Sequence, residues 1–68
     1  MRSGPAIIHL PSGAEYEGQT LYDGHAVTLE GCRRHVDGVG DERTVRRYQR
    51  IVRTWPIEAV AAVDWQEP

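Results

Sequence analysis

The chain has 68 residues, with eight arginines, no lysine and ten acidic residues, so its formal net charge is −2. A chain this short has room for one domain with a thin core, and we expect a single domain over residues 1–68 with its core at about 6–65. The single cysteine, Cys32, excludes an intrachain disulfide, and a lone thiol is typical of a reducing cytoplasm. The apolar run before Pro11 is too short for a signal sequence or a membrane span. We therefore predict a cytoplasmic protein that does not enter a membrane.

Charge is unevenly distributed along this chain. Between residues 33 and 53, seven arginines stand against three acidic residues, a formal balance of +4, whereas the rest of the chain has a balance of −6. Such asymmetry indicates an anionic partner or self-association between opposite faces. The planar donor fork of arginine suits phosphates and carboxylates. A genome with arginine-biased codon usage would give the same excess of arginine over lysine, so both explanations stay open.

Glycine and proline divide the chain into short runs of strand-like composition. Gly18 predicts a bend or bulge inside the second run. Asp23-Gly24 predicts a hairpin turn, residues 37–42 predict a hairpin loop, and Pro56 begins a short helical turn. The runs themselves give the predicted strands, which are residues 6–10, 14–22, 25–36, 44–55 and 59–65.

Residues 42–53 also permit a helical interpretation, because arginine, glutamate and glutamine favour helices. The residues at helical spacing are Val45, Tyr48, Ile51 and Val52. The β-branched content and the flanking glycines favour a strand. We therefore expect an all-β fold, a small five-stranded, strongly bent antiparallel barrel of the SH3/Sm type with one short helical turn before the last strand. The residues expected in its core are Ile8, Leu10, Tyr16, Leu21, Val27, Leu29, Ile51, Val52, Ile57, Val60 and Val63.

Two segments carry a resemblance to a known family. "HLPSGAEYEGQTLYDGHAVTL" resembles the first motif of the Sm-like proteins, and "IVRTWPIEAVAAV" is similar to the second motif of their bacterial Hfq branch. The resemblance covers about residues 7–63 and implies a small barrel that binds RNA as an oligomer. Four features depart from the family, the first being the little room before Pro5 and Ala6 for the N-terminal helix usual in Sm proteins. The spacing from Gly18 to Asp23 is one residue short, the Arg-Gly pair of the eukaryotic and archaeal second motif is absent, and Arg53-Thr54-Trp55 replaces the RNA-contacting Tyr-Lys-His triplet.

A basic strand with an interleaved aromatic residue can pair with phosphates while a base stacks on the ring. The preceding strand would widen this patch across the hairpin. Two other interpretations stay open: a solvated hairpin whose charges prevent edge aggregation, and arginines that pair with acidic residues of another copy or protein. The candidate nucleic-acid-binding residues are Arg33, Arg34, Arg46, Arg47, Tyr48, Arg50 and Trp55.

Other kinds of site have little support. Trp55 is either a packed anchor at the barrel rim or a stacking platform. His9, His25, Cys32 and His35 are metal-ligand types, but only Cys32-x-x-His35 has ligand spacing, and a regular strand would point those two side chains to opposite faces. No catalytic motif is present. We therefore expect no catalytic residues, no metal, no cofactor and no enzymatic activity.

The function predicted from the sequence is that of a small Sm-like nucleic-acid-binding, regulatory protein, binding RNA rather than DNA and acting as a homo-oligomer. The alternative is an SH3-like protein-interaction module that docks on a larger enzyme or assembly without binding nucleic acid. The two predictions differ in their salt dependence, because phosphate binding releases counterions and weakens steeply as salt rises.

Overall fold

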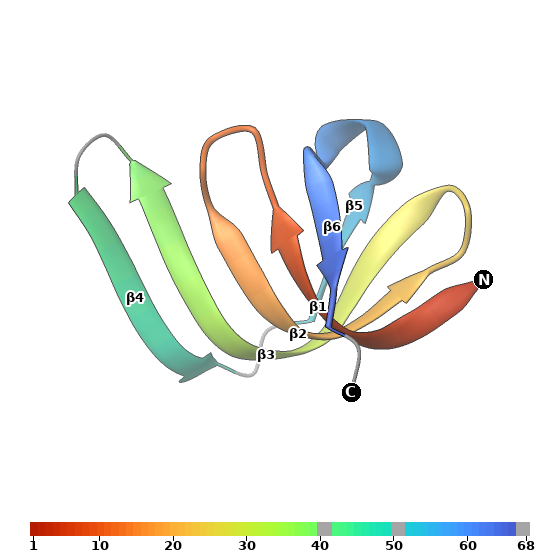
Figure 1. Cartoon of the computed structure of the whole chain (residues 1–68), viewed down its shortest axis with the longest axis horizontal. Coiled ribbons are helices and arrows are strands. Elements are labelled where there is room, and N and C mark those ends of the chain that lie inside the picture. Colours follow the sequence, from red (N-terminus) through yellow and green to blue (C-terminus); the bar gives the residue numbers. More distant parts are fainter. Residues whose placement is uncertain (40–41, 50–51, 67–68) are drawn as a thin grey trace.

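The computed structural model describes residues 1–39, 42–49 and 52–66, and for residues 38, 39 and 42–49 it describes the backbone alone. These residues form a sheet that bends strongly, within overall extents of 35 × 23 × 21 Å (Figure 1). No helix in the described ranges has the length and apolar character needed to cross a membrane. The elements are β1 (Arg2–His9), β2 (Glu15–Tyr22), β3 (Ala26–Val39), β4 (Glu42–Gln49), β5 (Arg53–Pro56), the 3-10 helix η1 (Ile57–Ala59) and β6 (Ala62–Trp65).

All strand pairs are antiparallel, in the order β4-β3-β2-β1-β6, with β5 also paired to β3. Residues 26–29 of β3 pair with β5 and residues 32–39 pair with β4, while β2 pairs along almost the whole of β3. A strand has only two edges, so β4 and β5 must follow one another along the edge that β2 leaves open. The six strands thus occupy five positions across the sheet, the number predicted from the sequence.

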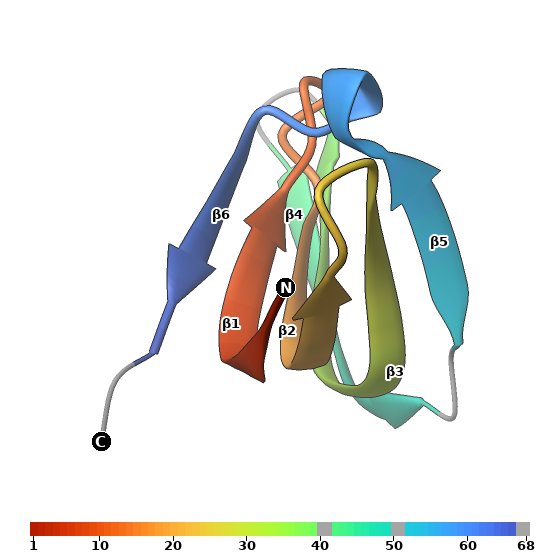
Figure 2. The ribbon, with the colours of Figure 1, turned by 90° about the vertical axis from the view of Figure 1, so that its right-hand side faces the viewer.

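The sheet is open in the described part of the chain, because β5 pairs only with β3 and β6 pairs only with β1. Figure 2 shows β5 and β6 on opposite sides of the strands that lie between them. The prediction of an all-β antiparallel fold is confirmed, but the pairing that would close a barrel is not present among these residues. The helical interpretation of residues 42–53 is wrong for the part described, since residues 42–49 form a strand. The single predicted strand 44–55 is instead divided between β4 and β5.

The bend of β3 is associated with two extra residues. Register shifts fall at two places within residues 17–20 of β2, and each leaves one residue of β3 without a partner on β2: Arg33 at the first shift and Glu30 at the second. Such bulges bend a strand and increase its local twist. They allow β3 to belong both to the packed part of the sheet and to the β3–β4 hairpin, which lies at the left of the molecule in Figure 1.

Gly18 lies where β2 and β3 approach most closely. A Cβ atom built at this position would stand 1.8 Å from the carbonyl oxygen of Gly31 and 3.1 Å from a methyl carbon of Leu29. Because the nearest obstacle is backbone rather than a flexible side chain, only glycine fits. The bend or bulge predicted at Gly18 from the sequence is confirmed by the register shift between Glu17 and Gly18.

The core lies on the inner, concave face of the bent sheet, where successive inward residues of neighbouring strands meet. Thr20 is the one buried polar side chain of the described residues, and its hydroxyl donates to the Gly18 carbonyl over 3.0 Å, so it is not left unsatisfied. Val52, predicted in the core, is 70% exposed, and this prediction is wrong; Ile51 lies outside the described residues. The buried cluster is Ile8, Tyr16, Val27, Leu29 and Cys32, with Leu10, Ala14, Tyr22, Trp55, Ile57, Val60 and Val63 packed against it.

The turns follow local sequence chemistry. Asp23 Oδ1 accepts hydrogen bonds from the backbone N–H groups of His25 (2.8 Å) and Ala26 (2.9 Å), and Gly24 supplies a φ of 99°, as the predicted Asp-Gly turn requires. The second hairpin is also confirmed, but β3 runs to Val39, so its loop is shorter than the predicted 37–42. The helical turn after Pro56 is confirmed as η1.

Candidate nucleic-acid interface

The β3–β4 hairpin brings the two arginine-rich segments of the sequence side by side. In its backbone register, Arg34 stands opposite Arg47 and His35 stands opposite Arg46. Directly opposite residues of an antiparallel pair have Cβ atoms only about 5 Å apart. The predicted widening of the basic patch across the hairpin is therefore present in the backbone. Arg50 lies outside the described residues, and Tyr48 is placed by its backbone alone.

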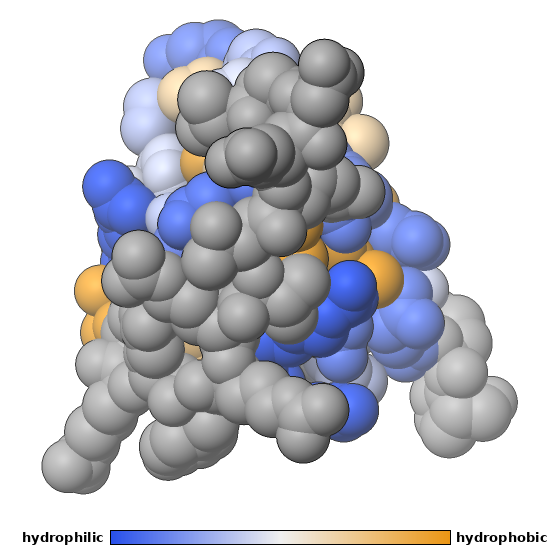
Figure 3. Space-filling view, turned by 90° about the vertical axis from the view of Figure 1, so that its left-hand side faces the viewer, coloured by the Kyte–Doolittle hydropathy of each residue, from blue (hydrophilic) through white to orange (hydrophobic). Residues whose placement is uncertain are grey.

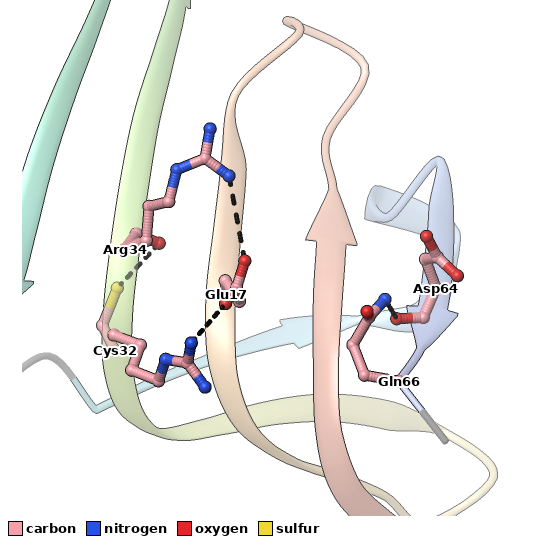
Figure 4. A network of polar contacts seen from close by, with 6 residues as sticks. Glu17, Cys32, Arg34, Asp64 and Gln66 are labelled. Atoms are coloured by element: carbon pink, nitrogen blue, oxygen red, sulfur yellow. Dashed lines mark hydrogen bonds and ion pairs between the residues drawn. The ribbon is translucent and has the colours of Figure 1, made fainter. Parts of the chain in front are cut away.

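Arg33 and Arg34 both approach the carboxylate of Glu17 on β2. Arg33 Nη2 lies 3.5 Å from Glu17 Oε2, and Arg34 Nη1 lies 3.8 Å from Oε1. In the close-up of Figure 4, Glu17 stands on β2 between two guanidinium groups that reach across from β3. The side chains of Arg33 and Arg34 remain 78% and 48% exposed, whereas that of Glu17 is 22% exposed. Two cations thus share one anion at the surface, and a net positive charge remains.

A separate cluster of rings lies on the inner face of the sheet. The Tyr16 ring stacks on the His35 ring at a centroid distance of 4.2 Å, and the half-buried Trp55 ring lies 5.1 Å from Tyr16 at a tilt of 51°. Arg53 Nη1 donates a hydrogen bond of 2.9 Å to the Tyr16 hydroxyl, and its guanidinium also lies over the Trp55 ring at 5.6 Å. Trp55 therefore packs against the core while retaining some exposed surface.

His35 joins the inner cluster to the hairpin. Its Nε2 lies 2.8 Å from Asp37 Oδ1, an ion-pair distance, yet neither ring nitrogen makes a hydrogen bond of good geometry within the described residues. The His35 ring thus lies between the stacked Tyr16 ring and the Asp37 carboxylate.

The expected placing of Cys32 and His35 on opposite faces of a strand is wrong. Cys32 pairs with Gly18 and His35 pairs with Tyr16, and these two positions of β2 lie on the same, inner face. The bulge at Arg33 inserts one residue and so restores both side chains to one side. Burial raises the pKa of the Cys32 thiol, whose Sγ lies 3.4 Å from the Arg34 carbonyl oxygen. Among the described residues, no group of three or more His, Cys, Asp or Glu side chains is arranged to hold a metal ion.

The candidate residues therefore divide between the two faces of the sheet. Arg34 stands opposite Glu17 and so lies on the outer face, whereas Trp55 stands opposite Val27 and lies on the inner face. Seen from the β4 side, the described surface is mostly hydrophilic with small hydrophobic areas (Figure 3). A single nucleotide cannot contact both groups without passing around an edge of the sheet. Arg33 and Arg34, rather than Trp55, form the described part of the basic patch.

Two residues of these clusters were not among the candidates predicted from the sequence. Glu17 holds the arginine pair, and Arg53 holds the rings of Tyr16 and Trp55 together. The alternation of the segment "EYEG" places Glu17 on the face opposite Tyr16, which was a signal for an exposed acid. Its partners depend on the register of β3, which the alternation does not reveal.

The chain matches no protein-family model, no curated protein and no solved structure.

Proposed function

We propose that this chain is a small nucleic-acid-binding protein whose ligand is single-stranded RNA, and that it acts in regulation. The observation that carries the proposal is the register of the β3–β4 hairpin, which sets Arg34 opposite Arg47 on the face that also carries Arg33. Cationic residues on adjacent strands can pair with successive phosphates of one backbone. RNA is proposed as the ligand because of the resemblance to the Sm-like family. The order of the strands in the bent sheet is compatible with an SH3/Sm-type architecture, and this supports the same proposal.

Binding would begin with electrostatic capture, because the acidic remainder of the chain leaves the hairpin as its basic region. Arg33 and Arg34 are exposed and are joined to Glu17 only at 3.5 and 3.8 Å, longer than strong guanidinium–carboxylate hydrogen bonds. Most of their donors therefore stay available to phosphate oxygens. Arg47 would extend this surface, since it stands opposite Arg34, whereas the position of Arg46 is opposite His35, on the inner face with Trp55. A base would stack on Tyr48 or on the exposed part of Trp55 only where the RNA passes around the edge of the sheet.

We also propose that the protein acts as a homo-oligomer. Both sides of the open sheet end in strands that are paired on one edge only in the described ranges, β6 on one side and β4 and β5 on the other. Unpaired edges of this kind readily pair with another chain. Light scattering after size exclusion tests this part, and a strict monomer at high concentration would contradict it.

The decisive experiment measures affinity for a short fluorescein-labelled single-stranded RNA by anisotropy across a range of salt concentrations. The double variant R34Q/R47Q should bind at least about tenfold more weakly, and its slope of log K against log salt should be shallower by about 1.4, since two phosphate contacts are lost. The change to glutamine removes charge without placing a new acid beside Glu17. The matched control is the single variant R2Q, which removes an arginine at the opposite end of the sheet, where Arg2 pairs with Tyr22.

Equal affinity of R34Q/R47Q and the unaltered protein would refute the proposal. The alternative of a protein-interaction module has one supporting observation, namely that Arg33 and Arg34 already hold a carboxylate. That function predicts no RNA binding at any salt concentration, together with binding to an acidic partner that the same double variant weakens.

A further inference from the structure

The contact between Glu17 and two consecutive arginines is unusual for a β-strand. Successive side chains of a regular strand point to opposite faces, so neighbouring residues do not ordinarily reach the same group. Arg33 is the extra residue of a bulge, between Arg34, which pairs with Glu17, and Cys32, which pairs with Gly18. This bulge allows the guanidinium of Arg33 to approach the same carboxylate as that of Arg34.

The two guanidinium groups divide the carboxylate between them. Arg33 faces Oε2 and Arg34 faces Oε1, so each oxygen of one anion has its own cationic donor group. A phosphodiester group has the same arrangement, with two non-bridging oxygens that share one negative charge. The arginine pair is therefore an oxyanion site of suitable shape for a phosphodiester, and Glu17 fills it.

The hold on Glu17 is weak enough for a ligand to displace it. Both N–O distances exceed those of strong charge-assisted hydrogen bonds. The arginines are exposed to solvent, and ion pairs between solvated side chains contribute little because water and salt screen them. Glu17 itself retains 22% exposure, so its side chain can turn toward solvent.

We propose that Glu17 is an internal competitor for the oxyanion site of Arg33 and Arg34, and that a phosphodiester group of the RNA takes its place on binding. This inference rests on the proposed function and deepens it, since it assigns one residue that limits the affinity of the basic patch. Each binding event must replace two ion pairs within the protein by two with the RNA. Variants of the protein that lack this carboxylate would therefore bind any polyanion more tightly.

The test compares E17Q with the unaltered protein, using the same labelled RNA and salt series. E17Q should bind about 3- to 10-fold more tightly, because the ion pairs that must be broken are absent. Its salt slope should match that of the unaltered protein, since the same two arginines contact phosphate in both complexes. The matched control is E58Q, which makes the same change of charge at an exposed residue of η1 and should alter affinity less than twofold.

Three results would overturn the inference while leaving the proposed function intact: E17Q binds as the unaltered protein does, E17Q binds more weakly, or E17Q and E58Q tighten binding equally. In each case R34Q/R47Q would still bind less RNA than the unaltered protein. If neither the unaltered protein nor E17Q binds RNA, both proposals fail. Should E17Q not fold, Glu17→Thr provides a second neutral side chain, one that favours strands, and it should give the same tightening.

Discussion

The two halves of β3 make different use of the same strand. In the first half, Val27 and Leu29 are fully buried, and they stand opposite Trp55 and Arg53 of β5. Beyond the bulges, the second half exposes the two consecutive arginines Arg33 and Arg34 to solvent. The comparison teaches that the second half buries Cys32 and Val36 as fully as the first half buries Val27 and Leu29, and that it carries its charge on the side chains that face solvent. Three predictions test this division, from the largest expected effect to the smallest.

The junction between the two halves should be the most sensitive place in the chain. Gly18→Ala would set a Cβ atom 1.8 Å from the Gly31 carbonyl oxygen, and the strands would have to separate. We expect a loss of about 3 kcal/mol or more in the free energy of unfolding, measured by urea denaturation. Gly31→Ala is the matched control, because a Cβ atom there meets nothing within 4 Å, and its stability should change by less than about 1 kcal/mol. Equal effects of the two variants would contradict the close-contact explanation.

Within the first half of β3, Leu29→Ala should destabilise by about 2–5 kcal/mol, because it removes a fully buried side chain and leaves a cavity. Val52→Ala removes an apolar side chain that is 70% exposed, and it should change stability by less than about 0.5 kcal/mol. Both values come from the same urea experiment. A large effect of Val52→Ala would mean that this residue is covered, for example by another copy, and dilution of the sample would then reduce the effect.

The smallest of the three effects belongs to the β2–β3 turn, which lies in solvent. The backbone N–H groups of Ala26 and His25 hold the pKa of Asp23 below its ordinary value of 3.8. When a carboxyl has a lower pKa in the folded state than in the unfolded state, its ionised form stabilises the fold. This stabilisation is complete at pH values above the unfolded-state pKa, and it is lost as the pH falls through the folded-state pKa. The stability difference between the unaltered protein and Asp23→Ala should therefore be constant above about pH 4 and shrink below it. A difference independent of pH for Asp23→Ala would exclude the carboxylate contacts.

The sequence predicted the parts of the fold that depend on local chemistry. Asp23-Gly24 indicated a turn, because both the carboxylate that accepts the backbone hydrogen bonds and the glycine with positive φ lie within four residues of sequence. The β-branched residues of 42–49 favoured a strand over a helix. The break between β4 and β5 was missed, because Ile51 and Val52 are β-branched and continue the strand-like composition past Gln49. Val52 was therefore placed in the core, although it is exposed.

The site was less predictable than the strands, because its geometry depends on pairing between distant residues. The arginines themselves were found from composition alone. Their contact with Glu17 depends on a register shift in β2–β3, and the shared face of Cys32 and His35 has the same origin. Only the position of Gly18 hinted at such a shift, and it did not indicate which residue of β3 would be displaced.

The two bulges also restrict which changes of length β3 can accept. Between the pairs Thr20–Leu29 and Tyr16–His35, β3 has two more residues than β2, an even surplus, so both pairs keep the same sidedness. Deletion of one residue, Arg33 or Glu30, would make that surplus odd. Every later side chain of β3 would then point to the opposite face of the sheet. Removal of both would preserve sidedness while straightening the strand. We therefore expect this segment to tolerate the deletion or insertion of two residues but not of one.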